Sequence, residues 1–217
     1  MGSGLILLAF VVPHLANAAL GIFSFEAMET LRDWLAPVWR STAGTVLLYG
    51  AMTSHFALAL YSLFRRTTLR MPAWEAAQLI LGLAIVPLLA FHATFNRIVW
   101  ELTSFKVDYH LVIASIWYTD LETWRIILLV VVVWTHLVIG LHFWGRVKAH
   151  YPRFLPFVYA IAVLLPVLAL LGFIRSGMNP AKSGGEEYVG RMLNTPFNPD
   201  LQLILDLEPV TLWTFSV

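Results

Sequence analysis

Long apolar stretches separated by short polar connections run along most of the chain. A helix that crosses a bilayer needs about 20 mostly apolar residues. Five segments meet this requirement, at residues 5–25, 42–64, 72–95, 124–144 and 154–174. The apolar stretch at 210–217 is typical of the first part of a sixth span. The pattern therefore predicts one domain over residues 1–217, an all-α integral membrane protein built as an antiparallel bundle of five complete spans plus the start of a sixth.

Three features modify this picture locally. Pro87 and Pro166 lie inside predicted spans, where proline removes a backbone donor and is expected to kink the helix. Residues 107–118 are too short to cross, so we expect an interfacial helix along the outer face, with His110 simply placed in that interface. Residues 1–4 (MGSG) are interpreted as a cloning remnant or a trimmed start and are left out of the fold.

Composition supports a membrane protein and excludes several kinds of chemistry. The chain is 59% hydrophobic and 12% charged, whereas soluble domains carry about 25% charged residues. The net charge is +1, and no basic run suggests nucleic acid as a partner. The chain has no cysteine, which excludes disulfides, iron–sulfur ligation and thiolate metal sites within it.

The distribution of charge predicts the orientation in the membrane. The connections 65–74 and 145–153 each carry three Lys or Arg residues and no acid. Of the 13 acidic residues, 12 fall in the segments 26–33, 101–122 and 186–208. Under the positive-inside rule, the two basic connections face the cytoplasm and the acidic loops face outward.

Four histidines lie well inside consecutive predicted spans: His14, His55, His92 and His136. An ionisable residue within a span is a functional hypothesis by default. A single histidine is more often a neutral side chain hydrogen-bonded to a neighbouring helix. One histidine in each of four successive spans, with no lysine and only Glu75, at the start of its span, as an acid, favours ligation instead.

The other side chains in the spans restrict the choice of metal. A zinc site needs several ligands around one point, often with carboxylate or thiolate. A di-iron bundle needs glutamates on facing helices. Haem iron needs only axial ligands, for which histidine is suitable. Two pairs of histidines on four helices would hold two haems b with both axial positions filled.

Depth along the helices predicts one of the two pairs. His55 lies ten residues before Arg65, and His136 lies ten residues before Arg146. At the rise of an α-helix, both therefore lie about 15 Å from the cytoplasmic boundary. Equal depth is what a shared inner haem would require.

The remaining two histidines form the second predicted pair. His92 lies eighteen residues after Trp74, about 27 Å from the cytoplasmic end of its helix, so it belongs to an outer site. His14 remains as its partner.

Three more side chains are weighed as candidates. His142 faces about 120° away from His136 and lies about 9 Å closer to the cytoplasm, so it is expected at the interface, or at a haem propionate or a quinone. Arg97 is a candidate for outer-haem propionates, or is an ordinary arginine at the membrane boundary. His150 is expected to be solvated in its basic connection.

The pattern of one histidine per helix resembles the dihaem cytochrome b membrane anchors of succinate:quinone oxidoreductases. In that family the first and third helices share the outer haem, and the second and fourth share the inner one. The resemblance covers residues 5–174 and rests on the spacing of His14, His55, His92 and His136.

The amino-acid sequence around those histidines carries a closer resemblance. The stretches SHFALALYSLFRRTTLRMPAWEAAQLILGLAIVPLLAFH (54–92) and VVWTHLVIGLHFWGRVKAHYPRF (132–154) look like the membrane domains of certain bacterial class III adenylate cyclases. The resemblance implies a six-span dihaem anchor in a bacterial inner membrane, followed by ferredoxin-like and cyclase domains in the cytoplasm and dimerised through the cyclase. This chain has no ferredoxin cysteines and no cyclase motifs, so no catalytic residue is assigned to it.

Three hypotheses follow. The first is a haem-bearing sensor of quinone or redox state that regulates a cytoplasmic adenylate cyclase, which makes cAMP from ATP. The second is the cytochrome b anchor subunit of a respiratory complex that transfers electrons to quinone. The third is a membrane protein without haem, in which the histidines are structural.

Overall fold

The computed structural model describes residues 2–102, 108–117 and 119–178, and describes side chains in these ranges except at 98–102. All regular structure in these ranges is helical. The long helices are α1 (Gly2–Ala19, continued by the 3₁₀ turn η1, Leu20–Ile22), α3 (Thr42–Phe64), α4 (Ala73–Leu102), α6 (Asp120–Gly145) and α7 (Tyr151–Gly177). Two shorter helices, α2 (Phe25–Arg40) and α5 (Tyr109–Trp117), lie between them.

The five predicted spans are confirmed as helices. Each of α1 with η1, α3, α4, α6 and α7 is long and apolar enough to cross a membrane, and most of their side chains face away from the interior of the bundle. An apolar exterior is what a lipid environment requires. The stretch 210–217, predicted to begin a sixth span, lies outside the described residues.

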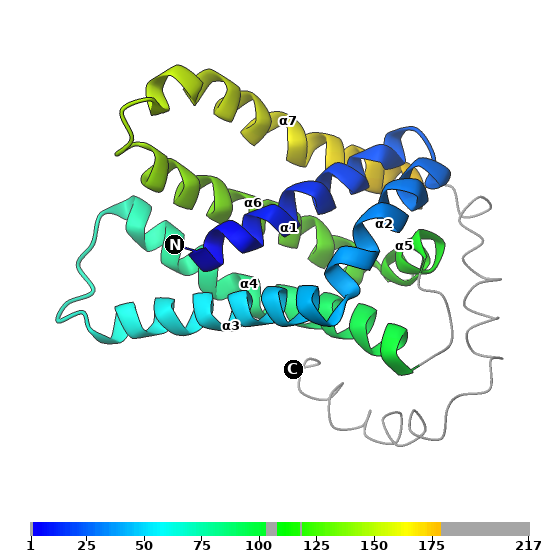
Figure 1. The fold of residues 1–217 in the computed structure, drawn as a ribbon, viewed down its shortest axis with the longest axis horizontal. Helices are drawn as coiled ribbons and strands as arrows, with labels where there is room; N and C mark the ends of the chain where they lie inside the picture. The colour runs from blue at the N-terminus through cyan, green and yellow to red at the C-terminus, as the bar shows by residue number, and fades with distance from the viewer. Residues whose placement is uncertain (1, 103–107, 118, 179–217) are drawn as a thin grey trace.

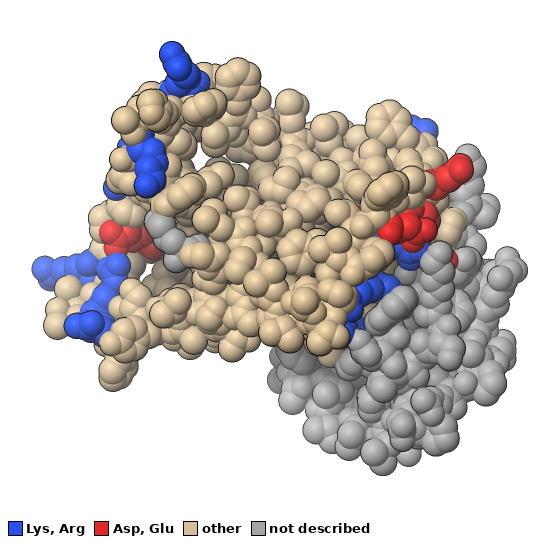
Figure 2. Space-filling view, viewed as in Figure 1, with Lys and Arg blue, Asp and Glu red and all other residues tan. Residues whose placement is uncertain are grey.

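The helices are arranged so that the two basic connections share one end of the bundle. Figure 1 shows the α3–α4 and α6–α7 connections at the left, with α2 and α5 at the opposite end. Figure 2 shows two charged ends separated by an uncharged band: the left end carries mostly Lys and Arg, and the right end carries acidic residues together with Lys and Arg. The excess of positive charge at the left end agrees with the sidedness expected from the sequence.

The core lies between α6, α7 and their neighbours. Near the α5 end it is formed by Ile113, Ile116, Ile126, Leu129 and Phe173. A second cluster of Leu15, Trp134 and Ala169 joins α1 to α6 and α7. Closest packing occurs between α1 and α7, α4 and α6, and α1 and α3.

Pro166 shows how the bundle accommodates a proline inside a span. Proline has no N–H to donate to the carbonyl four residues earlier, which here is that of Ala162. The indole Nε1–H of Trp134 on α6 donates to this carbonyl at 2.7 Å. A neighbouring helix thus satisfies the freed acceptor, as expected where water is absent.

The structure corrects three local expectations, while the interpretation of residues 1–4 as a cloning remnant or a trimmed start stays a prediction. Residues 2–4 belong to α1, where Ser3 and Gly4 lie beside His55. The acidic segment 26–33 is part of helix α2 rather than a loop. The N-cap of α2 is Ser24, whose hydroxyl accepts a hydrogen bond from the backbone N–H of Ala27 at 3.1 Å.

The third correction concerns the predicted interfacial helix. Residues 109–117 are helical, but Leu111, Ile113, Ala114 and Ile116 of this helix are buried. The helix packs on α2, α6 and α7 instead of laying an apolar face on lipid. His110 stacks on Phe25 of α2, with ring centres 4.3 Å apart.

Candidate functional site

His55 of α3 and His136 of α6 face each other, with ring centres 6.2 Å apart and ring planes at 83°. Nδ1 of His136 lies 3.1 Å from the backbone carbonyl of Gln78 on α4. A carbonyl only accepts hydrogen bonds, so Nδ1 carries the proton and donates. In the neutral ring Nε2 then keeps its lone pair, and the side-chain amide nitrogen of Gln78 lies 3.5 Å from it; an Nδ1–H bonded to a carbonyl is also the usual state of a metal-binding imidazole.

Glycines lie beside both of these rings. A Cβ atom on Gly82 of α4 would lie 3.0 Å from Cε1 of His136, which is a tight contact, whereas a Cβ on Gly4 of α1 would lie 3.5 Å from Cε1 of His55, an ordinary van der Waals distance. The Ser3 hydroxyl lies 3.3 Å from Nδ1 of His55. The Gln78 carbonyl and the missing side chain of Gly82 therefore position His136, and the Ser3 hydroxyl lies beside His55.

His14 of α1 and His92 of α4 form a second pair, with ring centres 6.1 Å apart and ring planes at 62°. Phe10 stacks on His14 at 5.4 Å and 13°, and Trp39 of α2 meets the Phe10 ring edge-on at 5.2 Å. Within the described part of the chain, no hydrogen bond to either ring of this pair is found. Aromatic packing, rather than hydrogen bonding, holds the outer pair.

Both ring separations fit a single metal ion held between two imidazoles. An imidazole nitrogen binds such an ion at about 2 Å, as in zinc sites, and lies about 1 Å from the centre of its own ring. Two axial rings therefore have centres about 6 Å apart. The structure places the four histidines in the two predicted pairs, and ligation of haem iron by them stays a prediction.

The two helices that each pair joins are not closely packed on each other. Among the described residues, neither α1 with α4 nor α3 with α6 is a closely packed helix pair, although α1 packs on α3 and α4 packs on α6. Each histidine pair therefore joins two helices that otherwise make few close contacts.

The described residues contain no cluster of three or more His, Cys, Asp and Glu side chains that could hold a metal ion. The histidines lie in twos, not around one point. Two donors suit a group that supplies its own equatorial ligands, as a porphyrin does, and do not suit a tetrahedral metal.

The outer pair is covered by α2 and α5, which are tied together by polar contacts. The buried Asn17 of α1 donates to the Tyr109 hydroxyl at 2.9 Å. The Tyr109 amide donates to the Glu29 carboxylate of α2, and Glu29 pairs with Arg32 at 2.6 Å. Burial, and then the charge of Glu29, raises the pKa of the Tyr109 phenol, so Tyr109 stays a neutral hydrogen-bonding group.

Arg97, a predicted propionate partner, lies within a group of positive charges at this end. Partial burial lowers the pKa of the Arg40 guanidinium, and the charges of Arg32 and Arg97 lower it further. Clustered guanidinium groups favour an anionic partner. The Glu29 carboxylate, which pairs with Arg32, acts in the opposite direction, and the role of Arg97 at a propionate stays a prediction.

His142 lines a cavity of about 220 Å³ at the end of the bundle that carries the basic connections. Nδ1 of His142 lies 3.0 Å from the hydroxyl of Tyr151. Trp74 and Phe143, also in the wall, stack at 3.8 Å. Aromatic walls with one polar contact are typical of sites for planar organic ligands.

The sequence reasoning missed several side chains of these sites. Gln78, Gly82 and Arg125 were not considered, although each lies inside a predicted span. A glutamine and an arginine in an apolar segment are detectable signals. Gly82 has no such signal, because its importance comes from a ring on another helix.

Comparison with protein-family models, curated proteins and solved structures finds no match to this chain.

Proposed function

We propose that this chain is a transmembrane cytochrome b domain that binds two haems b. In this proposal His55 and His136 are the axial ligands of the inner haem, and His14 and His92 are those of the outer haem. The observation that carries it is the occurrence of two facing histidine pairs, with ring centres 6.2 and 6.1 Å apart, between helices that are not packed on each other.

The residues around each pair support such a role. The bond from His136 to the Gln78 carbonyl selects the tautomer that can bind a metal. Bound haem with both axial positions filled would supply one-electron transfer. The chain's own side chains would orient the ligands, exclude water and compensate the charge of the propionates.

The proposed biological role is a sensor domain. The resemblance of residues 54–92 and 132–154 to membrane domains of bacterial adenylate cyclases supports regulation of a cytoplasmic cyclase by the redox state of the quinone pool. The cavity beside His142 supports a quinone head group as the ligand, because it offers aromatic walls and a polar contact. The second candidate is an anchor subunit of a respiratory complex that reduces quinone, which the one-histidine-per-helix spacing favours equally.

Haem content tests the first part of the proposal. The chain purified from haem-replete cells should contain two haems per polypeptide in a pyridine haemochrome assay. A colourless preparation that is helical by circular dichroism and monodisperse in detergent would show that the histidines are structural.

Cyclase activity separates the two candidate roles. In the longer protein that the resemblance implies, activity should differ between reducing and oxidising quinone conditions. A stably folded variant carrying His55→Ala and His136→Ala should lose that difference. An unchanged response would remove the sensor role and leave the haems as structural or electron-carrying groups.

The proposed orientation has a direct test because the chain lacks cysteine. Thr67→Cys in the α3–α4 connection should react with an impermeant maleimide only from the cytoplasmic side, and Thr30→Cys in α2 only from the outside. Labelling of both from one side would contradict the topology.

A further inference from the structure

Arg125 and Glu122 form an ion pair in the first two turns of α6, with side chains 14% and 23% exposed. Nε of Arg125 donates to Oε2 of Glu122 at 2.9 Å. Charged residues within membrane spans are costly and usually functional. A partly buried ion pair is weak evidence for a purely stabilising role, because desolvation offsets much of the attraction.

The Arg125 guanidinium extends across to α4, to the turn that carries His92. Nη1 donates to the Leu88 carbonyl, which in a regular helix also accepts the amide of His92. The guanidinium lies over the Phe91 ring, 5.1 Å from its centre. Arg125 therefore contacts both the backbone and a side chain next to one ligand of the outer pair.

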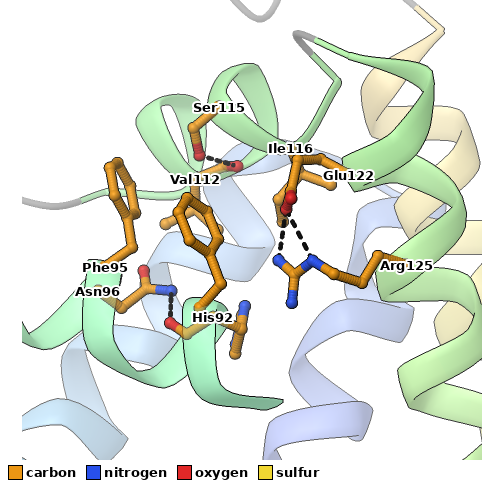
Figure 3. A pocket seen from close by; sticks show the side chains of 9 residues that line it. His92, Phe95, Asn96, Val112, Ser115, Ile116, Glu122 and Arg125 are labelled. Atoms are coloured by element: carbon orange, nitrogen blue, oxygen red, sulfur yellow. Dashed lines mark hydrogen bonds and ion pairs between the residues drawn. The ribbon is translucent and has the colours of Figure 1, made fainter. Parts of the chain in front are cut away.

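His92, Arg125 and Glu122 also line a common cavity of about 10 Å³, together with Asn96 and Ser115. This volume is about that of one water molecule, and the wall offers several polar groups. Figure 3 shows the Arg125 guanidinium joined to the Glu122 carboxylate, with the His92 ring on the other side of the guanidinium.

We propose that Arg125 sets the charge environment of the outer site and positions His92 within it. The inference rests on the proposed function. Arginine stays protonated at all relevant pH values, so its charge is fixed. One-electron reduction at the outer site adds one negative charge, and an adjacent positive charge in a low-dielectric interior stabilises the product. Arg125 therefore favours the reduced state of the outer haem, and Glu122 moderates the effect.

The test is a spectroelectrochemical titration of the complete chain with both haems bound. Arg125→Gln should disfavour reduction of the outer haem at least tenfold, which is about 59 mV for a one-electron couple, and leave the inner haem unchanged. Arg125→Lys should retain most of the wild-type potential. Glu122→Gln should shift the outer haem in the opposite direction.

Arg66→Gln is the matched control, since Arg66 also forms an ion pair, with Glu75 at 2.6 Å, but in the α3–α4 connection. It should move neither potential. A purely structural role for Arg125 would not give opposite shifts for Arg125→Gln and Glu122→Gln.

Each other outcome is decisive. If Arg125→Gln binds two haems with wild-type potentials, the inference is wrong while the proposed function stands. If Arg125→Gln loses the outer haem, Glu122→Gln decides: a raised outer potential supports the charge argument, and an unchanged or lowered one overturns it. If the wild-type chain binds no haem, the proposed function itself is wrong.

Discussion

The inner and outer histidine pairs have nearly the same ring separation but are held by different means. In the inner pair, a backbone carbonyl orients His136, and Gly82 lets its ring approach α4 closely. In the outer pair, Phe10 stacks on His14 and Trp39 packs on Phe10, and the ion pair of Arg125 shares a small cavity with His92.

This difference teaches how one bundle can give two similar sites separate properties. The position of the inner rings depends on the size of single residues on neighbouring helices. A larger side chain at one of these residues should therefore disturb the inner pair and leave the outer pair unchanged. The outer rings depend on helices α2 and α5 and on nearby charge, so they should respond to electrostatics and to the packing of that cover.

The largest expected effect comes from breaking the inner pair alone. In Gly82→Val the added side chain would meet His136, because even a Cβ would lie 3.0 Å from its ring. We expect loss of the inner haem and retention of the outer one, measured as haem stoichiometry falling from two to one. Gly50→Val in α3 is the matched control, since no atom lies within 4 Å of a Cβ there. Equal haem loss in both variants would mean that helix propensity, not ring contact, is responsible.

A smaller effect is expected at the cover of the outer pair. Tyr109→Phe removes the partner of Asn17, which is only 2% exposed. An unsatisfied buried amide costs about 1–3 kcal/mol. Heating in detergent should therefore release the outer haem at a lower temperature and leave release of the inner haem unchanged. Tyr61→Phe, at a residue that is 58% exposed, should have no effect; a shift of the inner haem in Tyr109→Phe would contradict the separation of the sites.

The smallest effect is expected at the start of α6. Thr119 caps this helix, its hydroxyl accepting the amide of Glu122 at 3.2 Å, and Thr119→Ala should cost about 1 kcal/mol. Without its cap, the first turn of α6, which carries Glu122, is expected to fray. On heating in detergent, the outer haem should therefore be released at a slightly lower temperature than the inner one. Thr30→Ala, whose hydroxyl donates within α2 instead of capping a helix end, is the control. If Thr119→Ala changed the release of the inner haem only, the proposed link between the α6 cap and the outer site would be wrong.

The spans and the proximity of the paired histidines could be predicted from the sequence, because they depend on the length of apolar segments and on the number of residues between a histidine and the charged end of its span. Apolar length defines α3, α4 and α6, and equal depth from Arg65 and Arg146 anticipates the proximity of His55 and His136. Helix α2 was missed because its polar face resembles a loop in a search for apolar runs.

The groups that surround the rings could not be predicted in the same way. The contacts of Gln78 with His136 and of Arg125 with Leu88 join residues 58 and 37 positions apart. They depend on which faces of α4 and α6 meet, and an apolar pattern that is similar all round each helix does not specify this. Residues 2–4 were excluded on composition, yet they lie beside His55.

The central claim, two haems each held by one histidine pair, is tested most directly by the four variants His14→Ala, His55→Ala, His92→Ala and His136→Ala. Low-temperature optical spectra, with a redox titration to resolve the two haems, should show which one each variant loses. The account predicts that His55→Ala and His136→Ala lose the same haem, and that His14→Ala and His92→Ala lose the other. Loss of one shared haem by His55→Ala and His92→Ala, or retention of two haems by all four variants, would contradict it.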